Sequence, residues 1–168
     1  MSNENQSALQ VVAGPKGIGG WLLLPIIGFM LTILLTLKNI IAIFTMENID
    51  GLIAIYTATS EPLVSLQVPV ALSMLFGVFV ILSAAYCLYL AFSKDYKIVK
   101  FATIHYLILL LTGLIESWGG FALAAAIPSE KVDNEIIKGA VQGIVVAMIW
   151  IPYFRTSLRV RNTFVKSV

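Results

Sequence analysis

The chain contains VPVALSMLFGVFVILSAAYCLYLAF at Val68–Phe92, a segment with no charged side chain. A helix needs about 20 mostly apolar residues to cross the hydrocarbon core of a bilayer, so this segment is long enough to span it. Three further segments meet the same requirement, at Ile18–Leu37, Phe101–Ile127 and Ile136–Tyr153. The sequence therefore predicts an all-α, polytopic membrane protein, a bundle of four transmembrane helices.

The composition agrees with this class. Of the 168 residues, 59% are hydrophobic and 12% are charged, which lies far outside the range of water-soluble globular proteins. The four spans occupy most of the chain and leave no room for a soluble domain. We expect a polar N-terminus at residues 1–17, a transmembrane domain at 18–153 and a basic amphipathic tail at 154–168.

Basic residues are distributed unevenly among the connections. One group lies in the N-terminus (Lys16), in the connection after the second span (Lys94, Lys97 and Lys100) and in the tail (Arg155, Arg159, Arg161 and Lys166). The other two connections hold only Lys38, Lys131 and Lys138, among six acidic residues. Because short loops rich in Lys and Arg stay on the cytoplasmic side, both termini are predicted to be cytoplasmic.

Small residues recur at four-residue intervals in the spans, as membrane helices need where their backbones approach closely. They are Gly28, Thr32 and Thr36 in the first span, Ser73 and Gly77 in the second, and Gly139, Gly143 and Ala147 in the fourth. Gly139 and Gly143 form a GxxxG pair. This pair favours packing within one bundle, with homodimerisation through the fourth span as the alternative.

Glu116, near the middle of the third span, is the strongest functional candidate. An ionised carboxylate there costs on the order of 3 kcal/mol, so Glu116 should face the bundle interior or a wet cavity. Helical spacing places it on one face with His105 and Thr112. Two roles remain open for Glu116: a neutral carboxyl that is hydrogen-bonded across helices, or a carrier of protons or substrate. His105, near the inner end of the span, is expected to be structural.

The tail is expected to form a short interfacial helix whose residues separate by face. The two sets are the basic Arg155, Arg159 and Lys166, and the apolar Phe154, Leu158 and Val165. Together with Arg161, the basic residues would bind anionic lipid headgroups or a partner protein. Nucleic-acid binding is not expected, because the cluster is short and lies against the membrane.

Motifs for enzymes and cofactors are missing from the sequence. It has one histidine and one cysteine, Cys87, and it lacks HExxH, CxxC, GxSxG and GxxxxGK[ST]. We therefore expect no catalytic residues, no metal site, no cofactor and no enzymatic activity.

Two segments, GGWLLLPIIG at Gly19–Gly28 and WIPYFRTSLRVRNTFV at Trp150–Val165, carry a family resemblance. They resemble the uncharacterised bacterial inner-membrane family catalogued as domain of unknown function 2569. The resemblance implies a bacterial cytoplasmic membrane. It also implies that the tail at Tyr153–Phe164 does more than anchor the chain, since an anchor needs positive charge but no particular order of residues.

These observations favour a small non-enzymatic inner-membrane protein: an accessory, assembly or immunity-type subunit acting through lipid, a membrane protein partner or a second copy of itself. The alternative is a small proton-coupled transporter that uses Glu116. A carrier needs Glu116 to reach water, whereas an accessory subunit does not.

Overall fold

The computed structural model describes residues 14–126 and 134–165. The described residues form one short 3-10 helix and six α-helices and contain no strand. In chain order they are η2 (Gly20–Leu22), α1 (Leu23–Ile43), α2 (Met46–Thr57), α3 (Val64–Phe92), α4 (Ile98–Ala126), α5 (Asn134–Thr156) and α6 (Leu158–Thr163).

Within the described residues, four helical stretches are long and apolar enough to cross a membrane: Gly20–Ile43, Val64–Phe92, Ile98–Ala125 and Ile137–Thr156. The predicted all-α fold with four transmembrane helices is therefore confirmed. The first helix continues past Lys38 and Asn39, which had marked the expected end of the first span. It continues because the residues after them, Ile40–Ile43, are again apolar.

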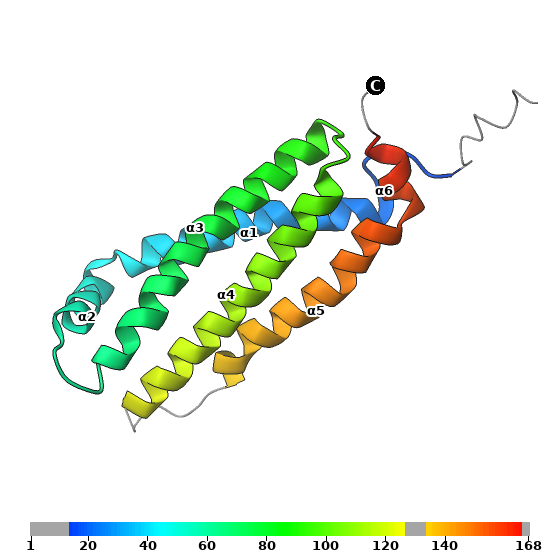
Figure 1. Ribbon diagram of the computed structural model, residues 1–168. Coiled ribbons are helices and arrows are strands. Elements are labelled where there is room, and N and C mark those ends of the chain that lie inside the picture. Colours follow the sequence, from blue (N-terminus) through cyan, green and yellow to red (C-terminus); the bar gives the residue numbers. More distant parts are fainter. Residues whose placement is uncertain (1–13, 127–133, 166–168) are drawn as a thin grey trace, which may run out of the picture.

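Helix α2 lies in the connection between the first two spans, where no helix had been expected (Figure 1). The segment mixes acidic and apolar residues and contains Gly51, yet it is helical throughout. Gln67 of α3 ties α2 down, because its side-chain amide donates hydrogen bonds to the carbonyl oxygens of Ile55 at 2.9 Å and Ala58 at 3.1 Å.

The main helix interfaces join α4 to α5, α3 to α4 and α1 to α3. Helices α1 and α5 approach each other only near α6 and then diverge, so these two helices close the bundle at that end alone (Figure 1). At the closed end, Phe29 of α1 packs on Phe154 of α5, with ring centroids 6.3 Å apart.

The two ends of the bundle differ in charge. We call the end that carries Lys16, the α3–α4 turn and α6 the basic end, and the end that carries α2 the acidic end. Most of the core lies toward the basic end, in a cluster formed by Leu22, Ile26, Phe29, Ala84, Cys87, Leu90, Ala91, Ile98, Ala102, Tyr106, Ala147, Phe154, Val160 and Phe164.

The tail folds back over the basic end and contacts the start of the chain. The backbone N–H of Gly17 donates to Thr163 Oγ1 at 2.9 Å, and Val165 forms an isolated parallel bridge with Asp95. We call the paired segments, residues 17–22 and 157–165, the terminal clasp. Both segments that carry the family resemblance contribute to it.

The faces of the tail differ from the prediction. The structure buries Phe154, Val160, Thr163 and Phe164, whereas Leu158 and Val165 are exposed. The reason is a break at Ser157, whose backbone is extended and whose hydroxyl caps α6 by accepting from the N–H of Val160. A break in the helix changes the direction in which the later side chains point. The predicted apolar face that joined Phe154 to Leu158 and Val165 is therefore wrong.

Candidate functional site

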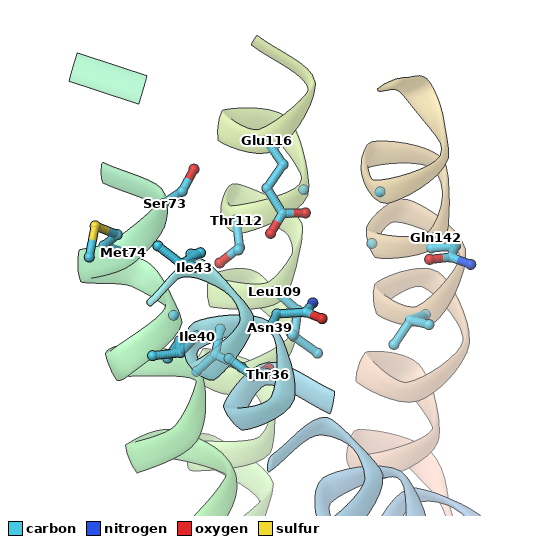
Figure 2. A pocket seen from close by; sticks show the side chains of 16 residues that line it. Thr36, Asn39, Ile40, Ile43, Ser73, Met74, Leu109, Thr112, Glu116 and Gln142 are labelled. Carbon is cyan, nitrogen blue, oxygen red and sulfur yellow. The ribbon is translucent and has the colours of Figure 1, made fainter. Parts of the chain in front are cut away.

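Glu116 projects from α4 into a cavity of about 310 Å³ that all four long helices line (Figure 2). We call it the Glu116 cavity. Its lining residues are Thr36, Asn39, Ile40, Ile43, Ser73, Met74, Gly77, Val80, Leu109, Thr112, Gly113, Glu116, Gly139, Gln142, Gly143 and Val146. Asn39, Glu116 and Gln142 are exposed, so the cavity opens to the outside of the bundle.

Close packing of α4 on α5 sets the position of the carboxyl. A Cβ added at Gly113 would lie 2.5 Å from the carbonyl oxygen of Gly139, so the two backbones touch here. Glu116 follows Gly113 by about one turn and reaches across the same contact. A Cβ added at Gly139 would lie 3.3 Å from Glu116 Oε2. The glycines therefore bring the carboxyl onto α5.

The GxxxG face of α5 is covered by α4 of the same chain. Gly139 meets Gly113, and a Cβ added at Gly143 would lie 3.0 Å from the Cα of Leu110. Ala147, one turn further, is buried. This is the arrangement that packing within one bundle requires, and it leaves no free GxxxG surface for a second copy.

The other two predicted packing glycines, Gly77 and Gly28, differ in how closely a neighbouring helix approaches them. Gly77 of α3 lies against α1, where an added Cβ would be 3.5 Å from Cδ1 of Ile40 and 3.8 Å from Cγ2 of Thr36. Gly28 has nothing within 4 Å of such a Cβ. The structure therefore gives Gly28 no role in close helix packing.

The polar side chains of the cavity come from every long helix but do not bond to one another. Thr112 donates its hydroxyl to the carbonyl oxygen of Ile108 in its own helix at 2.8 Å. Glu116, Asn39 and Gln142 make no side-chain hydrogen bond or ion pair to any described residue. The chain thus presents one carboxyl and two amides at this opening without satisfying them.

A second cavity, of about 560 Å³, lies beneath α2, and we call it the α2 cavity. Its walls are mainly apolar, with Leu52, Ile55, Leu66 and Leu123 among its lining residues. Four residues line both cavities: Ile43, Ser73, Met74 and Glu116. Glu116 therefore lies at the boundary between a polar opening and an apolar space.

The predicted polar face of the third span is divided by the structure. Thr112 and Glu116 share the cavity, but His105 is fully buried toward the basic end. Its Nδ1 lies 2.8 Å from Ser83 Oγ of α3, and its ring packs edge-on against Phe29 and Tyr106. His105 Nε2 is buried and has no partner among the described residues.

The basic tail residues also have separate environments. The guanidinium of Arg159 covers the glycines of the terminal clasp, because a Cβ added at Gly20 would lie 3.4 Å from Arg159 Cζ. Gly20 has φ +53°, which a side chain would strain. Arg155 and Arg161 are exposed, and Lys166 lies outside the described residues.

Asn39 is an amide of the cavity that the sequence did not single out. It directly follows Lys38, and the pair resembled the end of a span. Its position four residues before Ile43 in a continuing apolar pattern is the signal that could have placed it inside the helix. In the part of the chain that the structure describes, no group of three His, Cys, Asp or Glu residues is arranged to hold a metal ion.

Comparison of the sequence with known proteins identifies one family. No curated protein and no solved structure matched the chain. A family model described as "Protein of unknown function (DUF2569)" matches residues 15–165, a range that includes the terminal clasp, all four spans and Glu116. The chain therefore belongs to the DUF2569 family of proteins.

Proposed function

We propose that the chain is a non-enzymatic accessory subunit of a membrane protein assembly, and that the Glu116 cavity receives a transmembrane helix of its partner. One observation carries the proposal: Glu116, Asn39 and Gln142 face the open side of the bundle and have no partner among the described residues. Polar groups within a membrane normally face a protein interior, a cavity or a partner.

The chemistry of the opening selects the occupant. Membrane helices associate through close packing and interhelical hydrogen bonds, because lipid provides no hydrophobic drive between them. A carboxyl beside two amides complements a helix that carries a lysine, an arginine or an uncharged hydrogen-bond donor. Helices α1 and α5 diverge away from α6 (Figure 1), and the exposed side chains of Asn39 and Gln142 on these two helices are available to such a helix.

Site-specific photo-crosslinking tests this proposal. A photoreactive residue is placed at Gln142 or Asn39, and a control is placed at Leu82, which α3 exposes on its surface. We expect positions 142 and 39, but not 82, to crosslink to a transmembrane segment that contains a basic or hydrogen-bond-donating residue. The crosslink should disappear in a Glu116→Leu background. Adducts with lipid alone, or with equal yield from all three positions, would contradict the proposal, and an adduct with a second copy would replace the partner by a homo-oligomer.

A second candidate is a proton-coupled carrier. It is favoured by the volume of the Glu116 cavity, about 310 Å³, and by the place of Glu116 between two cavities. The measurement is proton flux into liposomes that contain the purified protein. Flux that is lost in Glu116→Gln establishes the carrier, whereas an accessory subunit gives no flux by itself.

We further propose that the basic end faces the cytoplasm of a bacterial cell, with both termini inside. The support is the concentration of Lys and Arg at that end, since such loops stay cytoplasmic. A reporter fused after Val168 should behave as cytoplasmic, and one inserted at Ser60, in the bend between α2 and α3, as external. The opposite pattern would reverse the orientation.

A further inference from the structure

A third cavity, of about 850 Å³, lies at the basic end where α3, α4 and α5 meet. We call it the basic pocket. Its lining residues are Tyr86 of α3, Tyr96 and Lys97 of the α3–α4 turn, Val99, Lys100, Phe101, Thr103 and Ile104 of α4, and Arg155 of α5. No residue of the Glu116 cavity contributes to it.

Three cationic side chains converge on this pocket from two regions far apart in the sequence. Lys97 comes from the α3–α4 turn and Lys100 from the start of α4, and Arg155 comes from the end of α5. Its described lining includes no acidic residue. Asp95 is close by in sequence, but its carboxylate accepts from the backbone N–H of Lys97 at 2.9 Å, and none of the three cations pairs with a described carboxylate. The pocket therefore carries uncompensated positive charge.

The remaining walls are aromatic and apolar. Tyr86 packs edge-on against Phe101, with ring centroids 4.6 Å apart, and both Tyr86 and Tyr96 are partly exposed. Thr103 donates its hydroxyl to the carbonyl oxygen of Val99, so it presents no free donor. Val99, Phe101 and Ile104 line the side of the pocket along α4. A ligand that fits has an anionic head and an apolar body.

The level of the pocket in the membrane identifies that ligand further. It lies at the end of three membrane-crossing helices, where tyrosines prefer the headgroup region. Basic pockets between transmembrane helices at this level suit phosphate-bearing lipid headgroups. We infer that the basic pocket binds the phosphate of an anionic phospholipid, whose acyl chains lie along Val99, Phe101 and Ile104.

This site differs from a general attraction between the tail and an anionic membrane. Arg159 is held over Gly20 in the terminal clasp, and Arg161 does not line the pocket. Among the described cations of the tail, only Arg155 takes part, together with two lysines that precede it by more than 50 residues. The bound phosphate would bridge the start of α4 and the end of α5. The inference goes beyond the proposed function and does not depend on Glu116.

Binding to the delipidated full-length protein in mild detergent tests the inference. The probes are short-chain phosphatidylglycerol, short-chain phosphatidylcholine and inorganic phosphate, measured by native mass spectrometry and calorimetry. The double variant Lys100→Gln/Arg155→Gln removes two pocket charges. The control Lys16→Gln/Arg161→Gln removes two exposed charges from the same end, outside the pocket.

We expect phosphatidylglycerol to bind, and the pocket variant to weaken that binding about tenfold or more, given the attraction of a basic residue to an anionic lipid surface. The control should change it by about twofold or less, and inorganic phosphate should compete only weakly. All four altered side chains are exposed, so both variants should keep the melting temperature of the unliganded protein.

Three results would overturn the inference. Equal losses in the two double variants would mean that the attraction is diffuse and involves no pocket. Phosphatidylcholine binding as tightly as phosphatidylglycerol would remove the recognition of net negative charge. Inorganic phosphate competing as well as the lipid would assign the pocket to a soluble phosphate compound instead.

Discussion

The two halves of the bundle are built from the same four helices but packed in opposite ways. Toward the basic end, α1 and α5 meet through Phe29 and Phe154, and the terminal clasp covers them. Toward the acidic end the same helices separate, and Glu116 faces the opening. The first half packs its aromatic and apolar side chains against each other, whereas the second leaves Glu116, Asn39 and Gln142 at an opening with no partner among the described residues. The difference indicates that the packing that stabilises the fold is concentrated at the basic end, whereas the proposed partner site lies in the open half.

The largest effect on stability should follow from Phe154→Ala. Phe154 is 1% exposed and contacts Phe29, Tyr106 and Tyr153. Truncating a buried phenylalanine typically costs about 3–5 kcal/mol. Unfolding in detergent measures the loss, with the exposed Phe92 mutated to alanine as the control. Phe92 lies at the same end of the bundle, so if Phe92→Ala costs as much as Phe154→Ala, the burial of Phe154 is not what stabilises the basic end.

A smaller but clear loss is expected from Gly113→Ala. The added methyl would lie 2.5 Å from the carbonyl oxygen of Gly139 and must push α4 and α5 apart. Overpacking of this kind typically costs about 1–3 kcal/mol. The matched control is Gly28→Ala, which meets nothing within 4 Å. Thermal unfolding compares the two, and equal melting temperatures would show that the contact of α4 with α5 yields easily.

Much of the fold could be predicted from sequence, because a membrane span needs only a long run of apolar residues. Two errors have physical causes. The helix break at Ser157 depends on a local hydrogen bond from the backbone N–H of Val160, which helical periodicity does not record. The first span was predicted to end at Leu37, before Lys38 and Asn39. One polar pair does not stop a helix whose apolar pattern resumes.

The candidate site could be predicted only in part, because its residues come from several helices. Glu116 stands out because a carboxyl in a span is costly, and this holds whatever the fold is. Its neighbours Asn39 and Gln142 come from other helices, so their placement depends on which faces of α1 and α5 meet α4. His105 shares a helical face with Glu116 in sequence, yet Ser83 and the aromatic cluster hold it in the other half.

The terminal clasp allows a finer test of the stable half. Thr163→Val removes the acceptor for the N–H of Gly17 and keeps the shape of the side chain. Loss of one hydrogen bond, with a donor left in a partly buried site, should cost about 1–2 kcal/mol. Thr156→Val is the control, because its hydroxyl is exposed and bonds only within α5. Proteolysis near Gly17 should increase in the first variant alone. Similar proteolysis of both would mean that α6 is held by the burial of Val160 and Phe164 instead.

The smallest change in stability is expected for Glu116, the residue to which we assign partner binding. Glu116→Leu removes no hydrogen bond or ion pair made within the described chain. The free energy of unfolding should therefore change by about 0.5 kcal/mol or less, as for other substitutions away from packed features. A loss well above about 1 kcal/mol would instead identify Glu116 as a carboxyl hydrogen-bonded across the helices, and the open half would then be part of the stable structure. If Glu116→Leu leaves the stability unchanged and abolishes crosslinking from position 142, Glu116 is needed for partner binding but not for folding. The open half would then differ from the basic end, because its carboxyl would contribute to binding and not to stability.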